Sequence, residues 1–215
     1  MPHPHHPEDR AVSLAWTGRN PVSAGWFEMR PANVPRDARP LYDEDLDCII
    51  GYRRTFSEVS FTYDLRGDMQ SIAELWTDAP ATGASPPLLV VGTLWRPGVR
   101  GMTRAGTEGE GAAMTVQALA GLRRRFNQLA RLPIHFSPLA LGDMQEPERF
   151  VPMHILRLAI RQGTRATYDS GISQYAALMS RRNQPRGIEI TVRDADGTIE
   201  RYRHWPSIGT AGAGS

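Results

Sequence analysis

Polar side chains that can act as acids, bases and phosphate binders gather in one short stretch near the C-terminus. The stretch runs from Ile188 to Trp205 and contains Asp196-Gly197, a pair typical of a two-residue type I′ hairpin turn. With that turn the ribbon has two chemically different faces, because successive residues of a strand point to opposite sides. A longer loop over 194–197 is the alternative, and it would shift the register and break this arrangement. The apolar face then holds Ile188, Ile190, Val192 and Ile199, and the polar face holds Glu189, Thr191, Glu200, Tyr202 and His204.

The polar face has the groups needed to cleave RNA without a metal ion. A histidine or a glutamate can take the proton of the 2′-hydroxyl, and a second group can protonate the leaving oxygen. An arginine can neutralise the charge that builds on the phosphorane. The same residues also fit a plainer interpretation, in which glutamates pair with arginine or histidine across an exposed sheet face. The sequence leaves both interpretations open.

Two helices before the ribbon are expected to support it. Apolar residues recur with helical spacing over 152–162, where His154 lies in the first turn. A polar loop over 164–171 follows and contains Arg165. Residues 172–182 are expected to form the second helix, with two arginines in its last turn that suit the helix dipole.

The order and spacing of residue types in this terminal stretch are recognisable. It consists of Val151-Pro152, Ile155-Leu156, Ala159-Ile160, Gly163-Thr164-Arg165, Asp169, Gly171, Tyr175, Met179, the strand Ile188–Val192, Asp196-Gly197-Thr198-Ile199, Tyr202 and His204. Residues 149–206 thereby resemble the C-terminal ribonuclease domains of bacterial polymorphic toxins, in the barnase-like and RelE-like group. The resemblance implies helices on a small antiparallel sheet, RNA cleavage without a metal and an immunity protein as partner. It places His204 and Tyr202 at the site with Arg165 or Arg201, and His154 as a further candidate.

The whole chain is predicted to be an α+β protein with a mostly antiparallel sheet, packed helices and a Pro-rich N-terminal arm. Period-two alternation predicts a strand over 59–65, and branched apolar runs predict strands over 48–56 and 88–95. The expected helices cover residues 69–77, 114–132, 152–162 and 172–182. The expected divisions are an extended arm over 1–40, an α+β portion over 41–148, a helix-helix-hairpin module over 149–206 and a flexible tail over 207–215.

Composition excludes several kinds of chemistry. All 25 basic residues are arginine, so neither a Schiff-base lysine nor a Walker lysine is available. The single Cys48 excludes an internal disulfide and a cysteine-based zinc site. No cofactor or metal site is predicted. The N-terminus lacks the apolar region of a secretory signal, and no run is long enough to span a membrane, so we expect a soluble protein in the cytoplasm or in a particle.

Two arginine clusters are the candidate contacts for nucleic acid. Arg123, Arg124 and Arg125 follow one another in the helix over 114–132, and Arg181 and Arg182 end the expected second helix. Phosphate groups are the partners that such clusters favour, although a solvated helix face gives the same pattern. The net charge of only +2 weakens a purely nucleic-acid-binding role.

Three functions follow from these observations. We rank first a non-catalytic structural or adaptor protein of a larger assembly, such as a phage particle or a secretion apparatus, with a protein partner or a second copy of itself. It would dock through its arm, which contains prolines and aromatic residues, and through its arginine-rich surfaces. A metal-independent ribonuclease toxin is the first alternative, and a nucleic-acid-binding module is the second.

Overall fold

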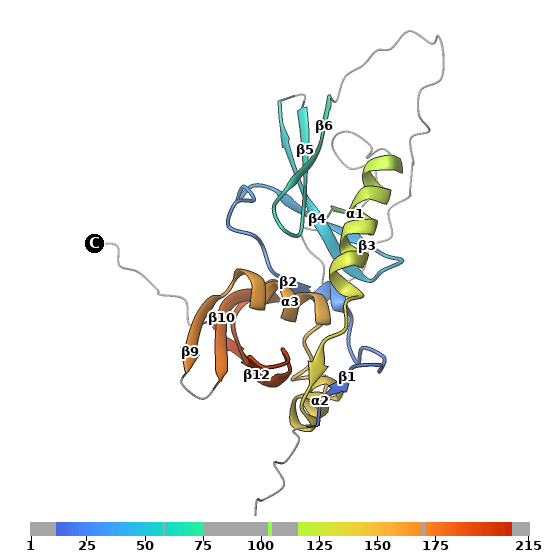
Figure 1. The fold of residues 1–215 in the computed structure, drawn as a ribbon. Helices are drawn as coiled ribbons and strands as arrows, with labels where there is room; N and C mark the ends of the chain where they lie inside the picture. Colours follow the sequence, from blue (N-terminus) through green and yellow to red (C-terminus); the bar gives the residue numbers. More distant parts are fainter. Residues whose placement is uncertain (1–11, 58, 75–102, 105–115, 169–170, 208–215) are drawn as a thin grey trace, which may run out of the picture.

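The computed structural model of this protein consists of two β-sheets with helices packed against them (Figure 1). It describes residues 12–57, 59–74, 103–104, 116–168 and 171–207. The fold is therefore α+β, as expected, and both sheets are mixed. The first half contains β1 (Leu14–Ala15), the 3-10 helix η1 (Ala24–Trp26), β2 (Phe27–Glu28), β3 (Arg39–Asp43), β4 (Cys48–Phe56), β5 (Val59–Asp64), β6 (Met69–Glu74) and β7 (Thr103–Arg104). The second half contains α1 (Val116–Ala130), β8 (His135–Phe136), α2 (Pro138–Gln145), α3 (Met153–Gln162), β9 (Thr164–Tyr168), β10 (Ile172–Arg181), β11 (Gln184–Arg193) and β12 (Ile199–Pro206).

The smaller sheet has five strands in the order β6-β5-β4-β3-β7, and only the β3–β7 pair is parallel. The strands expected over 48–56 and 59–65 are confirmed as β4 and β5. In β5 the buried side chains are the polar ones, Ser60, Thr62 and Asp64. Two of them are accommodated by local hydrogen bonds, since the Arg53 guanidinium donates to Ser60 Oγ and the Asp64 carboxylate accepts backbone N–H groups of the following turn.

Residues 69–74 form strand β6, so the helix predicted over 69–77 is wrong within the described residues. Gly67 has φ +84°, and its N–H donates to the Asp64 carbonyl in a tight turn that returns the chain onto β5. Pairing with β5 overrides the helical propensity of the segment, as tertiary contacts commonly do.

The larger sheet has seven strands, with β1-β8-β12-β11-β10-β2 along its main path and β9 also paired to β10. The helix predicted over 172–182 is wrong, because residues 172–181 form the ten-residue strand β10 between β9 and β11. The polar loop expected over 164–171 likewise contains strand β9. The closing hairpin of β11 and β12 is present, as predicted.

The helices predicted over 114–132 and 152–162 are confirmed as α1 and α3. α1 buries a stripe at three- and four-residue steps, formed by Leu119, Leu122, Phe126 and Leu129. The sequence interpretation predicted no helix between residues 132 and 152 and therefore missed α2. The sequence does contain a signal for the start of this helix, which is Ser137 followed by Pro138. In the structure Ser137 is the N-cap and accepts a hydrogen bond from the Ala140 N–H, and Pro138 occupies the first helical position.

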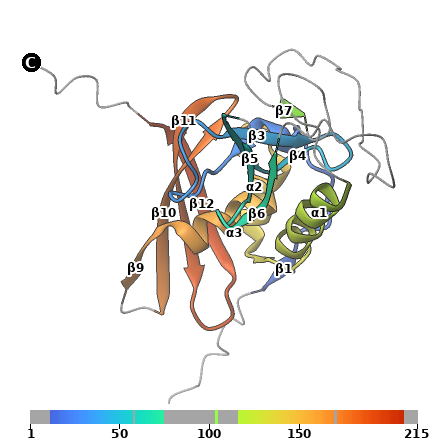
Figure 2. The same ribbon diagram turned by 90° about the horizontal axis from the view of Figure 1, so that it is seen from above.

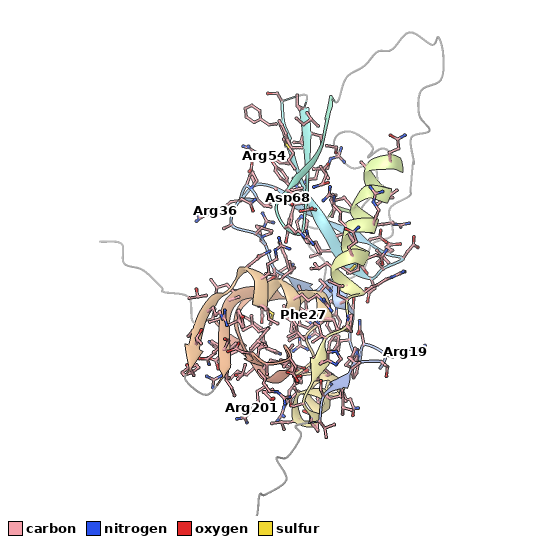
Figure 3. The ribbon with its side chains drawn as sticks, viewed as in Figure 1. Arg19, Phe27, Arg36, Arg54, Asp68 and Arg201 are labelled. Carbon is pink, nitrogen blue, oxygen red and sulfur yellow. The ribbon has the colours of Figure 1, made fainter. Side chains whose placement is uncertain are left out.

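Buried residues from both halves of the chain form one continuous apolar core. Phe27 of β2 meets Phe150 edge to face at a centroid distance of 5.9 Å, and both rings are fully buried. Figure 3 shows Phe27 where the two sheets approach each other, and Figure 2 shows α1 and α3 beside the sheets. Residues 12–40 are thus built into the fold in part, whereas residues 1–11 and the strand expected over 88–95 lie outside the described residues. The division near residue 148 stays a prediction.

Candidate functional site

The hairpin between β11 and β12 closes through the longer loop rather than the two-residue turn. The Arg193 N–H donates to the Thr198 carbonyl, and the Gly197 N–H donates back to the Arg193 carbonyl. A bulge next to Thr191 adds a further shift. As a result His204 pairs with Ile188 and Tyr202 pairs with Ile190, so the prediction that Glu189 shares a face with Tyr202 and His204 is wrong.

The changed register alters which residues share a face. Tyr202 and His204 lie on the side of the ribbon that carries Ile188 and Ile190, both of which are fully buried. Glu189 pairs with Arg203 on the opposite, solvent-facing side, where the two side chains form an ion pair of 2.9 Å. A one-residue slip moves every side chain to the other face, and the predicted polar face is therefore divided between two surfaces.

A cavity of about 570 Å³ lies beside β12, and we call it the β12 groove. One wall is formed by four consecutive residues of β12, from Arg201 to His204, with Glu189 and Thr191 of β11. The other wall is formed by Leu139 and Asp143 of α2 and by Glu148 and Arg149. Because consecutive strand residues point to opposite faces, a cavity that touches all four borders the edge of β12 rather than one face.

His204 is a neutral imidazole at the side of this groove. Its Nδ1 lies 3.2 Å from the Arg186 guanidinium, which can only donate, so Nδ1 accepts and the ring proton sits on Nε2. Nε2 is buried and makes no hydrogen bond in the described structure. The pKa of His204 is lowered to about 4, first by burial and then by the charges of Arg186 and Arg181, while the Arg149 and Glu148 backbone groups act in the opposite direction.

Tyr202 is buried next to it, with a hydroxyl that has no hydrogen-bond partner among the described residues. Burial raises the pKa of this phenol well above its ordinary value, and the carboxylates of Asp143 and Glu146 add to the effect while Arg149 opposes it. The hydroxyl therefore stays protonated throughout the physiological pH range and can serve only as a hydrogen-bonding group.

The other two candidates for catalysis lie elsewhere. His154 is buried in α3, where its ring meets Phe126 at a centroid distance of 5.1 Å, and burial lowers its pKa to about 4. Arg165 of β9 donates to Ser173 and forms a 3.2 Å ion pair with Asp194. Neither residue lines the β12 groove. Of the residues that the sequence suggested for catalysis, His204, Tyr202 and Arg201 line the groove.

Of the five arginines predicted to bind nucleic acid, four are engaged within the molecule. Arg123 clamps Asp43 and Asp45 at 2.6 Å each, and Arg125 lies 3.6 Å from Asp64.

Arg181 and Arg182 also have partners within the molecule. Arg181 is buried and donates to the carbonyls of Pro147 and Glu148. Arg182 lies over the Trp26 ring at 3.7 Å. Of these five arginines, Arg124 is the one that is exposed and has neither an ion pair nor a ring contact in the described part of the chain.

One long side of β12 has no neighbour among the described strands over most of its length. Among the described strands, β8 touches that side only through the pair of Phe136 with Ile199. The Ser207 N–H donates to the Pro185 carbonyl, which fixes the alternation of the ladder: residues 201, 203 and 205 direct their backbone groups to β11. The N–H and C=O groups of Tyr202 and His204 therefore point away from β11, into the β12 groove. Pro206 falls at a position where the missing N–H costs no ladder bond.

Charge on the groove walls is nearly all neutralised internally. The three carboxylates have arginine partners: Asp143 with Arg149 at 2.7 Å, Glu189 with Arg203 at 2.9 Å, and Glu148 with Arg181 at 3.5 Å. Arg201 forms no ion pair or hydrogen bond within the described residues, and Figure 3 shows it at the outside of the molecule near α2. Among the described residues, Arg201 is thus the one charged side chain of the groove that is left without a partner.

Comparison with family models, with curated proteins and with solved structures finds no match for this chain. Among the described residues, no three or more His, Cys, Asp or Glu side chains are grouped in a way that could hold a metal ion. No described helix has the length and apolar character that crossing a membrane requires.

Proposed function

We propose that this protein is a non-catalytic adaptor or structural protein that holds a partner in the β12 groove. The observation that carries the proposal is the unpaired side of β12, which faces a cavity of about 570 Å³. Protein partners commonly add a strand to such an edge. The docking site differs from the arm and arginine clusters that the sequence suggested, because four of the five arginines and the described segment 21–34 of the arm are largely engaged inside the fold.

The chemistry of the groove supports binding over RNA cleavage. General acid–base catalysis works best when the pKa of the catalytic group lies near the operating pH. Burial lowers the pKa of His204 to about 4 and raises that of Tyr202, so the one is a weak base and the other a weak acid at neutral pH. The Nε2 atom of His204 and the hydroxyl of Tyr202 are also closed off from solvent.

The convergence of His204, Tyr202 and Arg201 on one cavity is the observation that favours the ribonuclease alternative. The two functions are separated by incubating purified protein with single-stranded and structured RNA in EDTA. We expect intact RNA at all protein concentrations. Cleavage that is abolished by His204→Ala would replace the adaptor proposal with the ribonuclease.

A positive test uses selection from a random peptide display library on the purified chain. We expect binders that lose affinity when the β12 groove is altered by Arg201→Glu and keep it when Arg124→Glu makes the same charge change on α1. Arg124 is a suitable control because it is exposed and unpaired among the described residues. A library that yields no binder, or only binders that neither Arg201→Glu nor His204→Pro weakens, would refute the docking function.

A further inference from the structure

We infer that the β12 groove takes an extended peptide of alternating acidic and apolar residues, which adds to β12 as a further strand. The inference rests on the proposed docking function and names the chemistry of the partner. It follows from three features of the groove: the direction of its backbone groups, the charge left uncommitted on one side, and the apolar residue on the other.

The backbone groups of β12 determine that the partner is extended. Tyr202 and His204 each present one N–H and one C=O to the groove, two residues apart, which matches the repeat of a neighbouring strand. A helix cannot pair with these groups, because its own backbone bonds are satisfied internally. A peptide strand satisfies both pairs at once, and this is the source of affinity in strand addition.

The charges on the solvent-facing side favour acidic residues in the partner. Side chains of the added strand lie directly opposite those of β12, where opposite charges attract and like charges repel. Arg201 has no internal partner in the described structure, and the Arg203 side chain remains 72% exposed beside Glu189. Glutamate or aspartate at alternate positions of the peptide would therefore face the Arg201 and Arg203 side chains.

The same charges disfavour a second copy of this chain as the occupant. An antiparallel pair of β12 strands centred on Tyr202 would place Arg201 opposite Arg203, and one centred on Arg203 would place that arginine opposite itself. The remaining side of the groove carries Leu139 of α2, an apolar side chain that is 55% exposed. The residues of the partner between the acidic ones should thus be apolar.

The first experiment measures binding of labelled Ac-TEVEVEVT-amide by fluorescence anisotropy, with Ac-TKVKVKVT-amide as the charge-reversed control. We expect the acidic peptide to bind at least about tenfold more tightly, with an affinity that falls as salt screens the charges. Arg201→Glu should weaken the acidic peptide about tenfold and improve the basic one, whereas Arg124→Glu should change neither.

The second experiment tests strand pairing apart from side-chain chemistry. Two versions of the acidic peptide carry the same side chains, and backbone N-methyl groups are placed either on the glutamates or on the valines. Only one alternate set of N–H groups faces β12 in an added strand, so one version should lose binding and the other should keep it. The methylated set that abolishes binding also reports whether the strand is parallel or antiparallel.

On the protein side, the matched variants are His204→Ala and His204→Pro. Both remove the imidazole, but only proline removes the N–H that points into the groove, and proline is tolerated at an edge position of this kind. We expect His204→Pro to bind the peptide at least about tenfold more weakly than His204→Ala does, with both variants folded by circular dichroism. If the proline variant does not fold, the N-methylated peptides still decide the matter.

The outcomes separate the failure of this inference from failure of the docking function. Groove-dependent peptides from the random library that show no acidic preference, or equal binding of both N-methylated versions, would overturn the inference and leave the docking function standing. A dimer in light scattering that dissociates in His204→Pro would assign the edge to a second copy and also overturn it. The absence of any groove-dependent binder would overturn both.

Discussion

The stability of the protein should fall when His154 is forced to ionise. This imidazole is 4% exposed, its Nε2 makes no hydrogen bond in the described structure, and its pKa is lowered by burial from 6.5 to about 4. The unfolded chain binds a proton at this residue near pH 6.5, and the folded chain does so only near pH 4. Between these values the unfolded state holds more protons, so the free energy of unfolding decreases as the pH falls.

The size of the effect follows from the pKa difference. One pKa unit corresponds to about 1.4 kcal/mol, so His154 alone should remove about 2.5 kcal/mol between about pH 7 and about pH 4.5. Urea unfolding of the wild type and of His154→Phe at these two pH values measures it. Phenylalanine keeps a flat ring against Phe126 and does not titrate, and the contributions of the carboxylates cancel in the comparison.

We expect His154→Phe to lose about 2.5 kcal/mol less than the wild type over this pH interval. At neutral pH the variant should be as stable as the wild type or more so, because a buried nitrogen without a partner has been removed. Equal pH slopes in the two proteins would refute the assignment of His154 as a buried neutral histidine. A histidine resonance titrating near pH 6.5 at this position would do the same.

Three further substitutions and one matched control test the packing of the fold away from the groove. Phe150→Ala should cost about 3 to 5 kcal/mol of unfolding free energy in urea, because the ring is fully buried against Phe27, whereas Leu178→Ala on the exposed sheet face should stay within about 0.5 kcal/mol. Asp43→Ala should cost about 2 to 3 kcal/mol in the same assay, because a fully buried carboxylate that holds a guanidinium is lost. Gly67→Ala should lower the thermal midpoint by an amount that corresponds to about 1 to 2 kcal/mol, because φ is +84° and a Cβ atom would meet Asn33.

The sequence predicted the elements whose apolar residues follow the correct period. In α1 and α3 the buried apolar side chains recur at helical spacing in the sequence. β10 was mistaken for a helix because its buried face includes Ser173 and Arg181, whereas Leu178 on the outer face is 73% exposed. The usual contrast of apolar inside and polar outside is inverted there, and Arg181 is accommodated by carbonyl groups from a distant loop that no local pattern reveals.

The candidate site was predicted in part. The residues His204, Tyr202 and Arg201 were singled out from the sequence, and they do line one cavity. The reasoning that placed Tyr202 and His204 on one polar face relied on the wrong turn, because the Asp196 carboxylate accepts the Thr198 N–H and stabilises the longer loop. Arg201 was named only through the family resemblance, as an alternative to Arg165. The unpaired side of β12 could not be predicted, since it depends on how far β8 runs beside it and not on any residue of β12 itself.

Amide hydrogen exchange along β12 tests the docking account most directly. The ladder alternation predicts that the N–H groups of Tyr202 and His204 exchange rapidly in the free protein, while that of Arg203, bonded to β11, exchanges slowly. Addition of the alternating acidic peptide should then protect Tyr202 and His204 and leave Arg203 unchanged. Slow exchange of Tyr202 and His204 before any peptide is added would show that this edge is already occupied, and it would contradict the account.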